Sequence, residues 1–240
     1  MAEPALNDDP HLIPLSTTPI LGVADVISLA EVAARRAEKF GTMIDTLANG
    51  VATRASEVQA SLVNAGYPRR DAEAAAAKAA ATVRAEVKAN SSDARWAALK
   101  ELDAASAKLE TTAQLYASPV AVLARAGIGS PERTAFMQQL SGAGPVELRQ
   151  MALLAVSTGN KVLGASLVSL IDRLPRKDRP FSAADLADRL VGDETRKVQN
   201  AIAAVRHAAQ TALVRNREWE AGKASPIDRI KLVLNKKENA

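Results

Sequence analysis

Alanine makes up about a fifth of this 240-residue chain and is concentrated in long helical patterns. It is the best helix-forming residue, and its small side chain lets helix axes approach closely. Because alanine buries little apolar area per residue, helices of this composition gain most of their stability by packing against other helices. We therefore predict an all-α protein in which long helices pack side by side.

The composition is that of a folded chain with a thin core. Hydrophobic residues make up 48% of the sequence, which is enough for a globular core, but aromatic residues make up only 3%. The core must then consist mainly of Leu, Val, Ile and Ala. The chain has no cysteine, which excludes disulfides and metal sites built on thiolates.

Residues 1–22 are predicted to form an extended, proline-containing arm. Pro10, Pro14 and Pro19 each fix their own φ and disfavour helix in the residue before them, which leaves no room for a helical turn. The arm is partly apolar, so we expect it to lie on a neighbouring protein or on its own domain. Its predicted partner-binding residues are Leu12, Ile13 and Leu15.

Residues 23–117 are predicted to form a long, alanine-rich helical bundle or hairpin. Apolar residues spaced alternately by four and three positions predict one long helix first, and Asn49-Gly50 leaves open whether it is continuous. Two further helices are expected, at about 68–90 and 92–117. Trp96 is assigned to the apolar side of the last one.

Residues 118–192 are predicted to form a compact domain of short helices. Ser118-Pro119, Ser130-Pro131 and Gly144-Pro145 each place a capping residue before a proline, which is typical of a helix start. The predicted core is the following set of apolar residues at helical spacing: Met151, Leu153, Leu154, Val162, Leu163, Leu167, Leu170 and Ile171.

Residues 193–240 are predicted to form a long basic helix and a C-terminal docking helix. The preceding helix is expected to end near Gly192, and the next to begin near Glu194. Residues at unbroken heptad spacing form a predicted oligomer seam, namely Val198, Ile202, Val205, Ala209, Ala212, Asn216 and Trp219. Ser225-Pro226 starts the docking helix, which is expected to bind a partner or the core through Ile227, Ile230 and Leu234.

The same region allows a second interpretation, carried by Leu186-Ala187, Leu190 and Gly192, followed after a short turn by Val198 and Ile202. With this spacing, residues 183–206 resemble the helix-turn-helix family of DNA-binding motifs, although Gly192 comes five positions after Ala187, one more than the spacing of that family. That resemblance implies a second helix in the major groove. A wing would require strands at 213–219 and 227–234, whereas the assembly interpretation predicts helix in both places. The side chains that would contact bases or phosphates are Arg196, Lys197, Gln199, Asn200 and Arg206.

The uneven charge distribution along the chain is compatible with nucleic acid as a partner. Residues 173–240 hold 15 Lys and Arg against 9 Asp and Glu, a net charge of +6, whereas residues 1–172 have a net charge of −2. A basic C-terminal third is typical of a surface for an acidic partner, but also of an ordinary solvated helical face.

Residues that carry chemistry are few, so we predict no catalytic residue, no metal and no cofactor. The chain has two histidines and no Gly-x-Ser-x-Gly nucleophile elbow. In architecture, an arm, long alanine-rich helices and a docking tail look like phage virion components such as head–tail adaptors and internal head proteins. We therefore predict a non-enzymatic structural subunit of a homo-oligomer or larger complex, with a DNA-binding protein as the alternative.

The first twenty residues do not resemble a secretory signal. Asp8, Asp9 and several prolines interrupt the apolar stretch that such a signal needs. The longest apolar span, 162–171, is too short to cross a bilayer. We expect a protein without membrane contact that is cytoplasmic or associated with a virion.

Overall fold

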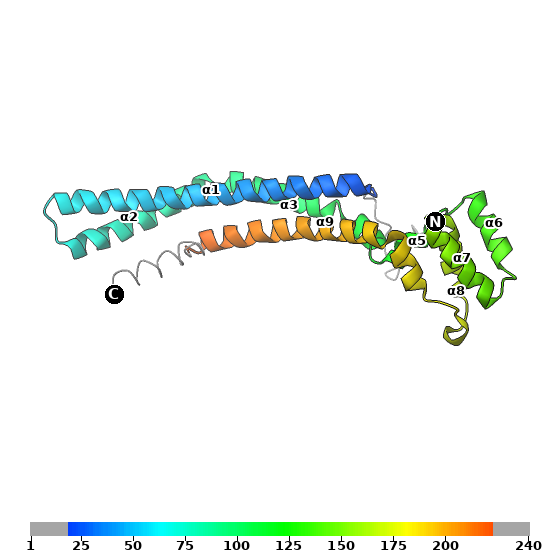
Figure 1. Cartoon of the computed structure of the whole chain (residues 1–240). Coiled ribbons are helices and arrows are strands. Elements are labelled where there is room, and N and C mark those ends of the chain that lie inside the picture. The colour runs from blue at the N-terminus through cyan, green and yellow to red at the C-terminus, as the bar shows by residue number, and fades with distance from the viewer. Residues whose placement is uncertain (1–18, 223–240) are drawn as a thin grey trace, which may run out of the picture. The chain divides into compact units, whose positions relative to one another are not determined.

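The computed structural model describes residues 19–222, and within that range the ordered elements are all helical (Figure 1). The all-α fold class predicted from the sequence is therefore confirmed. The chain divides into two compact units. Of the described residues, unit 1 contains 19–27 and 107–202, and unit 2 contains 28–106 and 203–222.

Two long helices and several shorter ones make up these units. The helices are α1 (Val23–Asn64), α2 (Arg69–Asn90), α3 (Ser92–Ala107), α4 (Glu110–Leu115), α5 (Pro119–Leu123), α6 (Pro131–Leu140), α7 (Pro145–Thr158), α8 (Lys161–Ile171) and α9 (Ala183–Glu220). A short 3-10 turn lies at Arg176–Asp178.

The predicted helix break near Gly192 is wrong, because α9 is continuous from Ala183 to Glu220. A glycine inside a helix costs only about 1 kcal/mol relative to alanine. Around Gly192 that cost is offset by burial of Val191, Thr195 and Val198 on one side of the helix. The turn that a helix-turn-helix needs is therefore missing from residues 183–206, and 213–219 is helix rather than the strand of a wing.

Two further points concern the helices of residues 23–117. The sequence left open whether the first helix is continuous at Asn49-Gly50, and in the structure α1 continues through both residues. The helix expected at 92–117 is instead α3 and α4, separated by a turn at Lys108-Leu109. Leu109 is fully buried at that turn, so the bend keeps an apolar side chain in the core.

Unit 2 consists of long helices that lie alongside one another (Figure 1). Phe40, Ile44 and Val51 are the large buried side chains on the α1 side, whereas α2 buries alanines, at Ala72 and Ala76. Small buried side chains on one helix allow close approach to larger ones on the next. The buried alanines of α2 therefore contribute to helix–helix packing in unit 2.

Unit 1 is a compact cluster of short helices around α8. This helix is buried on most of its surface, from Leu163 to Val168 and again at Ile171. Leu123, Leu140 and Leu148 pack around it from α5, α6 and α7. The N-caps predicted at Ser118 and Ser130 are present, since each hydroxyl accepts a hydrogen bond from a backbone N–H in the first helical turn.

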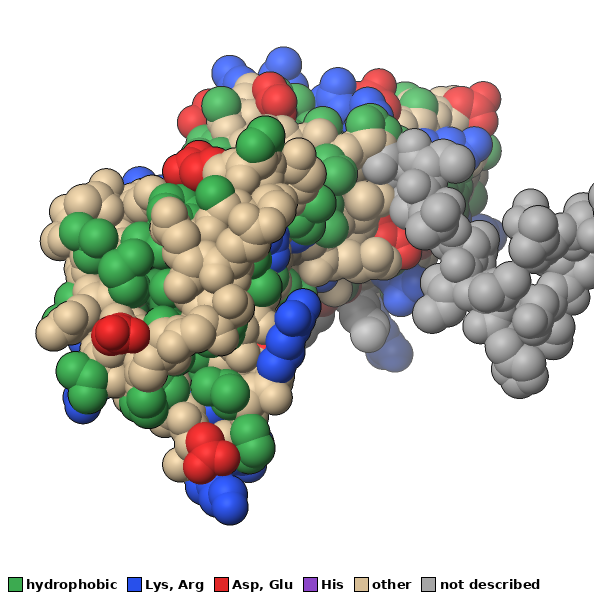
Figure 2. All heavy atoms as spheres, turned by 90° about the vertical axis from the view of Figure 1, so that its right-hand side faces the viewer, with side chains coloured by type: hydrophobic (Ala, Val, Ile, Leu, Met, Phe, Trp, Pro, Cys, Tyr) green, Lys and Arg blue, Asp and Glu red, His purple; other side chains and the backbone are tan. Residues whose placement is uncertain are grey.

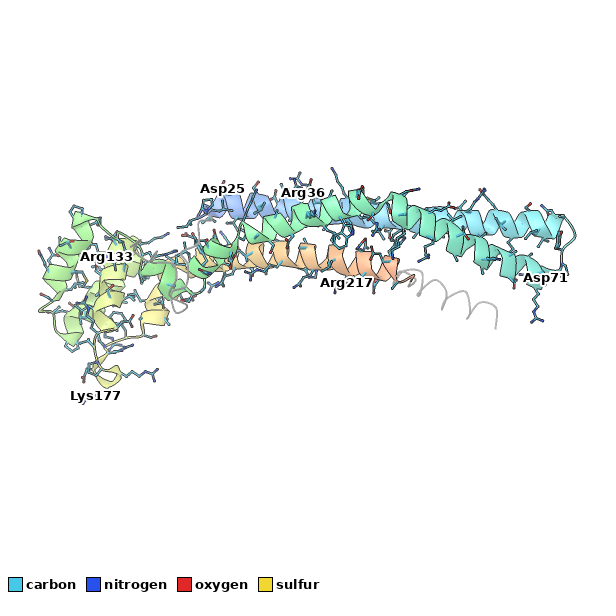
Figure 3. The ribbon with its side chains drawn as sticks, turned by 180° about the vertical axis from the view of Figure 1, so that it is seen from behind. Asp25, Arg36, Asp71, Arg133, Lys177 and Arg217 are labelled. Atoms are coloured by element: carbon cyan, nitrogen blue, oxygen red, sulfur yellow. The ribbon has the colours of Figure 1, made fainter. Side chains whose placement is uncertain are left out.

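Arg133 (labelled in Figure 3) ties three parts of unit 1 together. Its Nη1 donates to the backbone oxygens of Ala124 at 2.7 Å and Ala126 at 3.0 Å, which follow α5. Its Nη2 donates to Oγ of Ser169 in α8 at 2.9 Å. One guanidinium from α6 therefore satisfies carbonyls at a helix end that would otherwise lack donors.

No helix among the described residues is both long enough and apolar enough to span a bilayer.

Candidate functional site

A groove in unit 2 lies between α3 and the C-terminal part of α9. Its volume is about 510 Å³. The α3 side is lined by Trp96, Leu99, Lys100, Asp103 and Ser106. The α9 side is lined by Arg206, Ala209, Gln210 and Leu213.

The groove exists because small side chains face large ones across it. Ala209 and Ser106 leave space that Trp96, Leu99 and Leu213 border without filling. Trp96 remains 47% exposed, although the sequence pattern assigned it to the apolar side of its helix. An apolar groove with a few charged groups fits an amphipathic protein segment better than a small polar substrate.

Beside this groove, unit 2 contains a buried arginine. Arg95 in α3 is only 1% exposed, and its Nη1 donates to Oδ1 of Asn216 at 2.5 Å and to Oε1 of Glu220 at 2.7 Å. Its Nε and Nη2 donate to Oγ of Ser91 and to the backbone oxygen of Lys88, at 3.1 and 3.0 Å. Every nitrogen of the guanidinium therefore has a partner, which is what burial of a charge requires.

Trp219 completes this arginine cluster. Its ring lies 4.7 Å from the guanidinium carbon of Arg95, within the range of a cation–π contact. Asn216 and Trp219 were predicted to form part of a seam between subunits. In the structure they hold α9 against α3 of the same chain instead. Arg95 is absent from the residues predicted from the sequence, although its position four residues before the buried Leu99 places it on the apolar face of α3.

The arginine cluster makes the stability of unit 2 depend on pH. The hydrogen bond from Arg95 lowers the pKa of Glu220 below its ordinary value of 4.5, with the charge of Arg95 acting in the same direction. Because the folded-state pKa is depressed, this stabilisation is present above pH 4.5 and is lost as the pH falls through the folded-state value. We expect the unfolding free energy to decrease in that window, and Glu220→Gln to make the decrease shallower in urea titrations followed by circular dichroism. Identical pH profiles for the two proteins would contradict this role.

A second polar cluster lies in unit 1, where Glu194 in α9 is bound from two sides. Nζ of Lys161 donates to it at 2.7 Å, and the hydroxyl of Tyr116 donates at 3.4 Å. Burial, and then the charge of Glu194, raise the pKa of Tyr116. The cluster joins α8 and the end of α4 to α9.

The outer face of α7 is the clearest exposed apolar surface of unit 1. Val146 and Leu153, seven residues apart, are 70% and 69% exposed, and Leu154 is 47% exposed. The opposite face of the same helix is buried through Leu148 and Ala155. Figure 2, turned to face α6–α8, shows hydrophobic side chains at this end of unit 1. Leu153 and Leu154 were predicted as core residues, and that prediction is wrong because α7 is apolar on both sides and packs with only one.

The predicted oligomer seam lies inside the chain. Val198, Val205 and Ala212 are at most 1% exposed, and Ile202 is 5% exposed. Ala209 is half-buried and lines the groove. In this structure the side chains of the seam are therefore covered by their own chain rather than presented to a second copy.

Two of the five residues predicted to bind nucleic acid form ion pairs or hydrogen bonds within the chain. Arg196 forms ion pairs with Asp188 and Asp193, at 2.7 and 2.8 Å. Gln199 donates to the backbone oxygens of Tyr116 and Ala117. The remaining three, Lys197, Asn200 and Arg206, are exposed, and Arg206 lines the groove of unit 2.

The residues predicted to bind partners at the two ends of the chain lie outside the described range. These are Leu12, Ile13 and Leu15 in the arm and Ile227, Ile230 and Leu234 in the tail. Among residues 19–222, no group of three or more His, Cys, Asp or Glu side chains is arranged to hold a metal ion.

Comparisons with protein-family models, with curated proteins and with solved structures found no match to this chain.

Proposed function

We propose that the protein is a helical structural subunit, a non-enzymatic component of a homo-oligomer or of a larger complex. The observation that supports this best is the exposed face of α7, where Val146 and Leu153 are both about 70% exposed. Large apolar side chains grouped on one helix face favour protein–protein association, because their burial releases water from apolar surface. We take a second copy of the chain as the first partner to test.

The wider assembly that we propose is a virion, with the protein as a head–tail adaptor or an internal head component. The support for this class is architectural: long alanine-rich helices in unit 2, a compact helical unit 1, and a proline-rich arm in the sequence. Binding of nucleic acid through the basic C-terminal third remains a prediction. The missing turn at Gly192 and the ion pairs of Arg196 give it no geometric support.

The proposal predicts that the oligomeric state depends on α7. We expect light scattering of the full chain after size exclusion to give a multiple of the 25.2 kDa chain mass. Leu153→Asp should shift the mass toward 25.2 kDa, because a charge in an apolar interface is costly to bury.

The matched control is Gln139→Asp, which adds the same charge at an exposed position of α6 and should leave the mass unchanged. A full chain that is monomeric at all concentrations would overturn the homo-oligomer. An oligomer that is insensitive to Leu153→Asp would instead overturn the role of α7.

A further inference from the structure

The groove between α3 and α9 of unit 2 is lined by charged side chains that have no counter-charge in the described part of the chain. Lys100, Asp103 and Arg206 are exposed there, and none of the three forms an ion pair within residues 19–222. Much of the remaining lining is apolar, and Trp96 is 47% exposed. An occupant that covers this surface must also supply partners for both signs of charge, because an unpaired charge is costly to bury.

The charges on the two walls of the groove are complementary. The helices α3 and α9 run in opposite directions (Figure 1), and the hydrogen bond between Arg95 and Asn216 brings them level at one point. Counted from that contact, Asp103 lies eight residues along α3 and Arg206 ten residues along α9, or about 12 and 15 Å at the rise of an α-helix. The acidic residue of one wall and the basic residue of the other are therefore at nearly the same level.

The uncharged side chains of the two walls are matched in the same way. Trp96 and Leu213 lie one and three residues from the same contact, and both line the groove. Lys100 and Gln210 lie five and six residues from it. The large apolar side chain of α3 therefore has an apolar counterpart on α9 at its own level, and the lysine has a polar one.

We propose that the groove binds the same groove of a second copy, so that α3 and α9 of both copies form a four-helix bundle. A two-fold axis along the groove exchanges its walls and keeps their levels, so α3 of each copy lies on α9 of the other. Asp103 of each copy then pairs with Arg206 of the other, and Trp96 packs on Leu213. This contact rests on the homo-oligomer proposed above and is additional to that of α7.

A second copy fits the groove better than a partner of uniform charge. Such a partner would leave either Asp103 or Arg206 buried without a counter-charge, which opposes binding. A second copy presents both signs at the required levels, and each favourable contact is formed twice by symmetry.

Charge exchange between two variants tests this pairing. Both variants carry Leu153→Asp, which is aimed at the α7 contact, and the measurement is light scattering after size exclusion. Asp103→Arg alone and Arg206→Asp alone place like charges at both contacts of a symmetric dimer, so each should self-associate at least about tenfold more weakly than the Leu153→Asp parent. An equimolar mixture should form a heterodimer of twice the 25.2 kDa chain mass, because every contact then joins an arginine to an aspartate.

The matched controls for charge exchange are Asp71→Arg in α2 and Arg35→Asp in α1. They make the same charge changes at exposed positions outside the groove, and neither should alter the mass of the parent. A mixture that stays at 25.2 kDa, or a parent that is monomeric at all concentrations, would overturn the groove contact. Either result leaves the α7 contact to its own test, the effect of Leu153→Asp on the full chain.

Disulfide trapping between chains locates the contact independently, since the chain has no native cysteine. Trp96→Cys and Leu213→Cys are placed on separate full-length chains, which are mixed and oxidised with copper phenanthroline. The control mixture replaces Leu213→Cys with Thr211→Cys, an exposed position of α9 that does not line the groove. The first mixture should form the interchain disulfide at least about tenfold faster, because the contact holds its two cysteines at a high effective concentration. Equal rates in the two mixtures would overturn the proposal.

Discussion

Replacing Arg95 with alanine is expected to destabilise unit 2 by about 2–3 kcal/mol, the order of cost of leaving a buried polar group without its hydrogen-bond partner. The substitution leaves the carbonyl oxygen of Asn216, a residue that is 2% exposed, without its donor. It also removes the cation–π contact with Trp219 and the packing of a long side chain. Urea denaturation measures the loss, and hydrogen exchange assigns it to unit 2.

Arg36→Ala is the matched control for this prediction. Arg36 pairs with Glu101 at 3.5 Å, but the two side chains are 45% and 60% exposed. Exposed pairs contribute little, so we expect a change below about 1 kcal/mol. Equal effects of the two substitutions would show that the Arg95 cluster does not stabilise unit 2.

Replacing Leu167 with alanine is expected to destabilise unit 1 by about 2–5 kcal/mol. Leu167 lies in α8 with no exposed surface, at the centre of the core cluster. Truncation there removes buried apolar area and leaves a cavity that neighbouring helices fill only in part. The measurement is again urea denaturation, with hydrogen exchange of the α8 amides to localise the effect.

Leu153→Ala is the control, because sequence patterning assigned both leucines to the same core. Leu153 is 69% exposed, so its truncation should change the unfolding free energy by less than about 0.5 kcal/mol. A large effect of Leu153→Ala in a monomeric sample would contradict the exposed position of this residue. In an oligomer, the same loss would report the α7 contact that we propose.

Over residues 183–206, local apolar spacing does not distinguish a helix-turn-helix from one continuous helix. The apolar spacing over 183–206 fits two helices with a turn as well as one continuous helix, because a single glycine weakens a helix only slightly. The choice depends on burial of Val191, Thr195 and Val198, which is a tertiary property. The heptad spacing of α9 likewise predicts an apolar face correctly but does not say which chain covers it.

The sequence by itself determined the all-α class, the caps of the short helices and the helical periodicity of α9, because propensity, capping and spacing act between residues close together in the chain. Only the tertiary structure decided which apolar face of α7 is buried, that Arg95 is paired with Asn216 and Glu220, and that a groove remains between α3 and α9. Each of these depends on side chains far apart in sequence. Their distances follow from how the helices pack, and an amphipathic pattern does not specify the surface against which it will pack.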